Sequence, residues 1–249
     1  MFNVKNRWAF ITGASRGIGK LSAVFMAKQG CNLILHARKI ENLSDVETEA
    51  KAYGVEVKKV ACELSDLDAV DKMLKEIDAF NVDVDIVLNN AGLQIAYRTE
   101  YYETPVSDYM ESYKINTVAP AMICYHFLPK MEAKGVGRIV NTTSGIALEP
   151  EQAGYSASKA ALDKITIDLG SKLECSDVII SLADPGWCRT DLGGPQAPNA
   201  PESTIPGIVI GAFVDDGKSG RLFGAQDYNG LTLEEAYEKA QKTDSPYNK

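Results

Sequence analysis

Short apolar runs alternate with longer amphipathic segments through most of the chain. The apolar runs are rich in Val, Ile and Leu and predict strands at residues 8–11, 32–35, 55–61, 84–88, 138–142 and 178–182. The segments between them predict helices at residues 17–29, 41–53, 66–80, 106–115, 117–134 and 154–173. Ser65 directly precedes the third helix and is its candidate N-cap.

Strands that alternate with helices of this length predict parallel β-α-β units with helices on both faces of one sheet. The strands are almost continuously apolar, as expected when both sheet faces are covered. The pattern therefore predicts a doubly wound α/β fold, in which ligands bind beyond the carboxyl ends of the strands.

The regular alternation stops at residues 185–206, where prolines and glycines interrupt any period. A loop of this length in a compact domain is usually functional or mobile. We expect a substrate loop region at about residues 187–216. Regular structure is predicted to resume at residues 207–214, with a short strand near 221–223. A helix at 232–241 is expected within a C-terminal helix and tail, residues 226–249. The sequence shows no internal repeat and no linker, which predicts a single domain over residues 1–249.

A net charge of -8 with 45% hydrophobic residues describes an acidic globular chain. Nucleic acids and anionic membranes attract basic surfaces, so neither is an expected partner. No apolar run approaches the roughly 18 residues of a membrane span. The N-terminus has no signal-peptide core, so a cytoplasmic location is expected. The five cysteines form no C-x-x-C pair and have no histidine near enough for a zinc signature, so no metal site is expected.

A glycine-rich loop, Thr12-Gly13-Ala14-Ser15-Arg16-Gly17-Ile18-Gly19, follows the first strand and opens the first helix. Gly13 permits a tight turn, Gly17 lets the backbone approach a pyrophosphate, and Gly19 allows close helix–strand packing. The helix N-terminus presents free N–H groups to anionic oxygens. The glycines alternatively serve only the turn, but their place between the first strand and the first helix favours dinucleotide binding.

The end of the second strand indicates which dinucleotide is preferred. NAD-binding proteins usually place an acidic residue there to accept hydrogen bonds from the ribose hydroxyls. In this chain no carboxylate occurs before Glu41, and Arg38 stands near the strand end. Arg38 and Arg16 carry guanidinium groups whose geometry suits a 2′-phosphate. This favours NADP(H) over NAD(H); in the alternative interpretation both arginines are ordinary surface residues.

Tyr155 and Lys159 are the candidate proton-transfer groups. A separation of four residues places them one turn apart on one face of a helix. A phenol titrates near pH ~10, and a neighbouring ammonium stabilises the phenolate and lowers that pKa. Many helices carry such a pair on a solvated face, so the assignment depends on the surrounding motifs.

Five ordered motifs between about residues 7 and 190 resemble the classical short-chain dehydrogenase/reductase family. They are the glycine loop of residues 12–19, Asn89-Asn90-Ala91-Gly92, Asn116, Ser144 with Tyr155-Ser156-Ala157-Ser158-Lys159, and Pro185-Gly186. The resemblance implies a Rossmann-like domain with a seven-stranded parallel sheet in the order 3-2-1-4-5-6-7.

The resemblance also implies roles for individual residues. Tyr155 exchanges a proton with the substrate oxygen, while Lys159 lowers the pKa of Tyr155 and hydrogen-bonds the nicotinamide ribose. Ser144 holds the substrate oxygen, and Asn116 positions a water that links Lys159 to solvent. The implied cofactor-binding set is Gly13, Ser15, Arg16, Gly17, Ile18, Gly19, Arg38, Glu63, Leu64, Asn90, Ala91, Gly92, Tyr155, Lys159, Pro185, Gly186 and Thr190.

Some positions depart from the family pattern. Ser144 lies eleven residues before Tyr155, where the family more often has twelve or thirteen, so Thr143 is a weaker candidate for the same role and the loop at 145–154 must be short. Glu63 stands where the family usually has an aspartate that contacts the adenine amine. Asp184 directly precedes Pro185-Gly186, and the resemblance assigns it no role.

The segment at residues 185–194 looks most like the carbonyl-reductase and C-factor-like branch of the family. The implied function is an NADP(H)-dependent oxidoreductase that transfers a hydride between the nicotinamide and a carbonyl or alcohol carbon. The expected direction is reduction of a small ketone, aldehyde or quinone. One alternative is a cofactor-binding sensor or signalling protein with little catalysis. Another is an epimerase or dehydratase of the extended branch, for which a longer C-terminal domain is expected.

A small-molecule carbonyl or alcohol substrate is the expected partner. The family often forms homodimers or homotetramers through two long helices, predicted here at residues 117–134 and 154–173. Aromatic and apolar residues in the loops either line a hydrophobic substrate pocket or pack within those loops; they are Tyr97, Tyr101, Tyr102, Trp187 and Leu192. The two histidines, His36 and His126, are expected to be structural.

Overall fold

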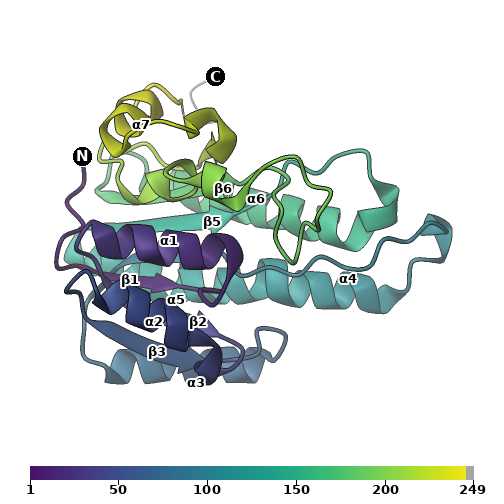
Figure 1. The fold of residues 1–249 in the computed structure, drawn as a ribbon, viewed down its shortest axis with the longest axis horizontal. Coiled ribbons are helices and arrows are strands. Elements are labelled where there is room, and N and C mark those ends of the chain that lie inside the picture. Colours follow the sequence, from purple (N-terminus) through teal and green to yellow (C-terminus); the bar gives the residue numbers. More distant parts are fainter. Residues whose placement is uncertain (245–249) are drawn as a thin grey trace.

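Seven parallel strands form one sheet at the centre of the molecule (Figure 1). In the computed structural model, which describes residues 1–244, the strand order is β3-β2-β1-β4-β5-β6-β7 and every neighbouring pair is parallel. The strands are β1 (Trp8–Ile11), β2 (Asn32–Ala37), β3 (Val57–Ala61), β4 (Val84–Asn89), β5 (Gly137–Thr142), β6 (Val178–Asp184) and β7 (Arg221–Gly224). The predicted doubly wound fold and its strand order are confirmed.

Helices cover both faces of this sheet. One apolar cluster lies between the sheet and α1 (Gly17–Lys28), α2 (Ser44–Lys51) and α7 (Leu233–Ala240). A second cluster lies on the opposite face, under α3 (Leu67–Ala79), α5 (Ala119–Lys134) and α6 (Ala153–Leu173). The shorter α4 (Val106–Tyr113) extends outward beside the start of α6.

Alternate residues of each strand feed the two clusters, because successive side chains of a strand point to opposite faces. On β1, Phe10 packs in the second cluster while Ala9 and Ile11 pack in the first. On β2, Ile34 and Leu35 divide in the same way. The side chains on both faces of the sheet are therefore buried, and this explains why the strands are apolar at nearly every position.

The predicted break between two helices near residue 116 is wrong. α4 continues through a π-helical turn, Lys114–Val118, directly into α5. The proposed cap Ser65 is also wrong: α3 begins at Leu67, and its N-cap is Asp66, whose carboxylate accepts a hydrogen bond of 3.0 Å from the N–H of Ala69. The helix predicted at 41–53 is a 3-10 turn, Ile40–Leu43, followed by the shorter α2.

The region after residue 206 completes the sheet. The segment at 207–214 contains a buried 3-10 helix, Gly207–Ala212, and the predicted short strand is β7. The predicted C-terminal helix is α7, which begins with a capping box formed by Thr232 and Glu235. Residues 245–249 of the predicted tail lie outside the described residues.

Across residues 1–244, no helix combines the length and the apolar character that a membrane crossing requires.

Candidate active site

A cleft of about 1090 Å³ opens at the carboxyl edge of the sheet. Parallel strands all end at the same edge, and the segments that follow β1 to β6 line this cleft together with the start of α6. Every predicted cofactor-binding residue lines it except Gly186, which follows the lining residue Pro185. Of the predicted catalytic residues, Tyr155 and Lys159 line the cleft, whereas Asn116 and Ser144 lie outside its lining. Most of the sequence motifs, far apart along the chain, therefore meet in one cavity.

The glycine loop has a backbone that only glycine accommodates. Gly13 and Gly17 have positive φ angles of 66° and 53°. A Cβ on Gly13 would lie 2.9 Å from Cα of Ala91, and a Cβ on Gly19 would lie 2.2 Å from the carbonyl oxygen of Gly13. The N-cap residue of α1, Arg16, makes no side-chain capping bond, so the first-turn N–H groups remain available to an anion beside the cleft.

His36 supports this loop, a role that the sequence did not reveal. Its Nδ1 accepts a hydrogen bond of 3.3 Å from the Gly13 N–H, so its Nε2 donates to the carbonyl of Cys62 at 3.0 Å. Burial lowers the pKa of His36 to about 4, although the Cys62 carbonyl opposes this shift. The ring is therefore neutral at pH 7 and ties the glycine loop to the end of β3.

Two arginines line the cleft beside the glycine loop and the end of β2. Arg38 follows β2, is exposed, and forms no ion pair within the residues that the structure describes. Arg16 forms an exposed ion pair of 2.7 Å with Asp191, which belongs to the loop after β6. A 2′-phosphate bound here would thus meet the guanidinium of Arg38, which is unpaired among the described residues, and that of Arg16, which already contacts Asp191. The sequence pattern did not indicate the pairing of Arg16 with Asp191.

Tyr155 and Lys159 lie one turn apart on α6, and both side chains are buried at the cleft. The ammonium of Lys159 donates a hydrogen bond of 2.7 Å to the carbonyl of Thr142 at the end of β5. Burial lowers the pKa of Lys159 to about 8, while Asp163 and Asp184 act in the opposite direction. Lys159 is therefore close to its titration point at neutral pH.

The pKa of Tyr155 is raised above its ordinary value, and the lowering effect expected from Lys159 stays a prediction. Burial is the main cause, and the negative charge of Asp184 adds to it, while a hydrogen bond with Ser144 acts against it. Desolvation disfavours a buried phenolate, and the ammonium of Lys159 is engaged with the backbone carbonyl of Thr142. In the free protein Tyr155 carries its proton.

The structure brings Ser144 rather than Thr143 to Tyr155. The Ser144 hydroxyl hydrogen-bonds the Tyr155 phenol and accepts a hydrogen bond of 3.3 Å from the Ile146 N–H. The Thr143 hydroxyl instead donates to the carboxylate of Asp163, one turn beyond Lys159 on α6. A spacing of eleven residues between Ser144 and Tyr155 therefore still allows their hydroxyl groups to form a hydrogen bond.

Asn116 lies in the π-helical turn and is fully buried. Its amide group pairs with the backbone of Leu93, donating to the carbonyl and accepting from the N–H, both at 2.8 Å. The same Nδ2 donates to the Ser158 hydroxyl at 3.0 Å. The side chain therefore fixes the loop after β4 against α6, next to Lys159.

Of the five loop residues considered for a hydrophobic pocket, only Leu192 lines the cleft. Tyr102 is 91% exposed, Tyr97 is 60% exposed, and Trp187 is 57% exposed, with its indole N–H donating to the Gly193 carbonyl. These aromatic side chains are exposed on the loop surface, and Leu192 alone of the five contributes an apolar side chain to the cleft.

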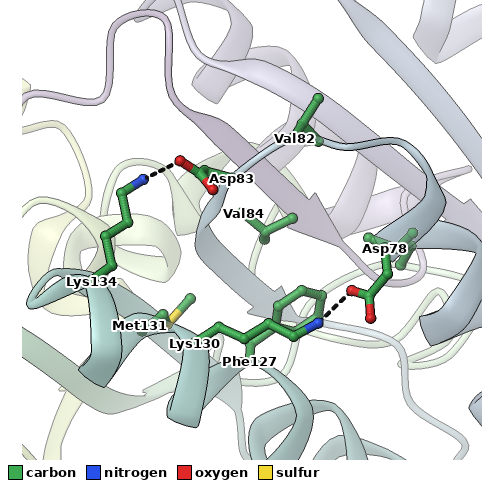
Figure 2. Close-up of a pocket in the computed structure, with 9 residues that line it drawn as sticks. Asp78, Val82, Asp83, Val84, Phe127, Lys130, Met131 and Lys134 are labelled. Atoms are coloured by element: carbon green, nitrogen blue, oxygen red, sulfur yellow. Dashed lines mark hydrogen bonds and ion pairs between the residues drawn. The ribbon is translucent and has the colours of Figure 1, made fainter.

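A second, small pocket of about 70 Å³ lies at the opposite edge of the sheet, where β4 begins. Figure 2 shows Val82, Val84 and Phe127 around it and two ion pairs on its rim. Lys130 pairs with Asp78, and Lys134 pairs with Asp83 at 3.0 Å. Because every cation of this rim is paired and the pocket is remote from Tyr155, the cleft is the candidate active site.

The chain belongs to the short chain dehydrogenase family, whose sequence profile matches residues 7–200. It is similar to an uncharacterized oxidoreductase of Mycobacterium bovis, with 30% identity over 221 residues that cover 85% of this chain and 65% of that protein. The chain therefore spans less than two thirds of the length of this relative.

Two solved structures are also similar. A metagenomic short-chain oxidoreductase in complex with NADP has 30% identity and a TM-score of 0.70, covering 81% of this chain and 88% of that one. A 3-oxoacyl (acyl-carrier-protein) reductase from Agrobacterium tumefaciens with NADP bound has 23% identity and a TM-score of 0.79, covering 89% and 93%. At that identity the second likeness concerns the fold alone.

Proposed function

We propose that this protein is an NADP(H)-dependent oxidoreductase that reduces the carbonyl group of a small ketone, aldehyde or quinone. The observation that carries the proposal is the arrangement of Tyr155, Lys159 and Ser144. Tyr155 and Lys159 line the same cleft as the glycine loop, and Ser144 hydrogen-bonds Tyr155. We further propose that residues 1–249 act as a single domain of the carbonyl-reductase-like branch, and that the residues predicted from the sequence form its site.

The cleft fits a nicotinamide dinucleotide. A pyrophosphate has room next to the start of α1, where no side chain caps the helix. The loop there follows the left-handed backbone of Gly13 and Gly17 and packs closely at Gly19, so it carries no side chains at these positions. Arg38, unpaired among the described residues and without a nearby carboxylate on β2, favours a 2′-phosphate, which supports NADP(H) over NAD(H).

When bound, the reduced nicotinamide supplies a hydride to the carbonyl carbon. Ser144 donates a hydrogen bond to the carbonyl oxygen, and Tyr155 transfers its phenolic proton to that oxygen as negative charge develops there. The ammonium of Lys159 stabilises the phenolate that remains. Asn116 holds the loop after β4 in register with α6, so that Lys159 keeps its position during the transfer.

The proposal is tested by NADPH oxidation over a panel of ketones, aldehydes and quinones. Turnover is expected with at least one member, and Tyr155→Phe is expected to reduce kcat by a factor of about 10² or more while NADPH affinity stays unchanged. Tyr125→Phe is the matched control, because Tyr125 is 59% exposed on α5 and does not line the cleft. Cofactor binding without turnover on any carbonyl would favour a sensor, and full activity in Tyr155→Phe would refute the mechanism.

A further inference from the structure

Asp184 is the last residue of β6 and directly precedes Pro185, which lines the cleft. Its Oδ1 accepts a hydrogen bond of 2.9 Å from the Gly186 N–H, which closes the turn after the strand. Its Oδ2 faces Gly145, where an added Cβ would lie 2.7 Å from this oxygen. The carboxylate thus stands between the segment that carries Ser144 and the turn that borders the cofactor cleft.

This carboxylate has no ion-pair partner among residues 1–244. The titratable groups that face it are Tyr155, Lys159 and Asp163 from α6 and Cys188 from the loop after β6. The only cation among them, Lys159, donates to the Thr142 carbonyl and is offset by Asp163 one turn further along α6. Asp184 is therefore a carboxylate without an ion pair among the described residues. It does not line the cleft itself, but it directly precedes the lining residue Pro185, and its charge acts on Tyr155 and Lys159, which do line it.

We propose that Asp184 acts through its charge to favour the oxidised, positively charged nicotinamide over the reduced, neutral one, and so biases this site toward carbonyl reduction. The inference rests on the proposed function. Donation of a hydride creates a positive charge on the nicotinamide ring, and a fixed carboxylate nearby stabilises that charge as it forms.

A second effect of the same charge acts in the same direction. Asp184 adds to the burial that raises the pKa of Tyr155, so the phenol keeps its proton at neutral pH. A protonated phenol is the form that carbonyl reduction consumes, whereas alcohol oxidation requires the phenolate. One carboxylate thus favours both the loss of the hydride from the reduced nicotinamide and the protonated form of Tyr155, and carbonyl reduction needs both.

The test compares the affinities of the oxidised and reduced dinucleotide, measured by calorimetry without substrate. Asp184→Asn keeps the side-chain oxygen that accepts from Gly186 but removes the charge. The ratio Kd(NADP⁺)/Kd(NADPH) is expected to rise about fivefold or more, since the two ligands differ only in the nicotinamide. A distorted cleft would weaken the binding of both dinucleotides to the same extent and leave this ratio unchanged. The ratio therefore distinguishes the loss of the charge from a change in the structure of the cleft.

Asp184→Ser, which also offers an acceptor for the turn, is expected to raise the ratio to the same extent and covers the case in which Asp184→Asn does not fold. Asp191→Asn is the matched control: it removes a charge of the same sign at the Arg16 end of the cleft, and the ratio should stay within about twofold of the wild type. A ratio that also stays within twofold in the Asp184 variants, with both ligands still bound, overturns the role of Asp184 alone. Failure of the wild type to bind either NADP(H) or NAD(H) overturns the proposed function and this inference with it.

Activity against pH gives an independent readout once a substrate is known. In Asp184→Asn the acidic limb of kcat/KM for alcohol oxidation is expected at lower pH than in the wild type, because the phenolate of Tyr155 forms more easily without the carboxylate. An unchanged limb contradicts the proposed effect on Tyr155.

Discussion

Burial of the Lys159 ammonium lowers the stability of the fold and places a positive charge beside Tyr155. The side chain of Lys159 is buried at the wall of the cleft, its one hydrogen bond within residues 1–244 goes to a backbone carbonyl, and burial lowers its pKa from 10.5 to about 8. Each unit of such a shift corresponds to about 1.4 kcal/mol, so the charged form destabilises the fold by roughly 3 kcal/mol at most. The same desolvation strengthens its interaction with any phenolate formed at Tyr155.

Lys159→Met is expected to raise the free energy of unfolding at pH 7 by about 1–3 kcal/mol and to abolish turnover. A lowered pKa means that the cost of the charged group is fully present below pH 8 and disappears as the pH rises toward 10.5. The gain should therefore be large at pH 7 and small at pH 10 in urea unfolding experiments.

Lys164→Met is the control for this change, since Lys164 lies on the same helix with a side chain that is 72% exposed. Its effect should stay within about 0.5 kcal/mol at both pH values. A Lys159 variant that is less stable than the wild type at pH 7 would show that the hydrogen bond to Thr142 outweighs the desolvation.

At the scale of elements, the contact between α4 and α6 sets the position of Tyr155. Gly154 opens α6 against α4, and a Cβ there would lie 2.9 Å from the carbonyl oxygen of Asp108. Asp108 is itself held by a bidentate pair with Arg98, with bonds of 2.7 and 3.1 Å. The backbone that Gly154 contacts therefore has little freedom to move away.

Gly154→Ala is expected to destabilise the protein by about 1–3 kcal/mol and to lower kcat, because the first turn of α6 must shift together with Tyr155. Thermal unfolding and steady-state kinetics measure the two effects. Ala160→Ser changes an exposed position on the same helix and should be nearly neutral. An increase in stability from Gly154→Ala, as helix propensity alone predicts, would mean that the α4–α6 contact relaxes without cost.

Over the whole molecule, a ligand that binds only the folded protein stabilises all of it. NADPH at 100 times its Kd adds about 2.7 kcal/mol, which for a chain of 249 residues raises Tm by roughly 5–10 °C. At the same concentration NADH is expected to give a smaller shift, because it offers no 2′-phosphate to Arg38.

Arg38→Asp is expected to reverse this order, so that NADH gives the larger shift in Tm, measured by scanning fluorimetry. The carboxylate repels the 2′-phosphate and accepts hydrogen bonds from the ribose hydroxyls of NADH. Lys39→Asp makes the same change of charge at the neighbouring exposed residue, which does not line the cleft, and should preserve the preference for NADPH. Equal shifts from the two cofactors in the wild type would contradict the assignment of NADP(H).

The sequence by itself determined the α/β class, the position of the strands and the order of the motifs. These are properties of local period and spacing: a strand buried on both faces is apolar at each position, and a helix brings Tyr155 and Lys159 onto one face wherever it folds. The glycine loop could be predicted because it is also a local feature. Gly13 and Gly17 adopt backbone angles that other residues avoid.

Only the tertiary structure decided what depends on partners distant in the chain. The π-helical turn at Asn116 is accompanied by amide pairing with Leu93, and neither residue signals it locally. The direction of the Tyr155 pKa shift depends on burial and on Asp184, which no spacing reveals. The desolvation of Tyr155 and the charges around it depend on which segments meet at the carboxyl edge of the sheet. The role proposed for Asp184 could therefore be inferred only from the folded molecule.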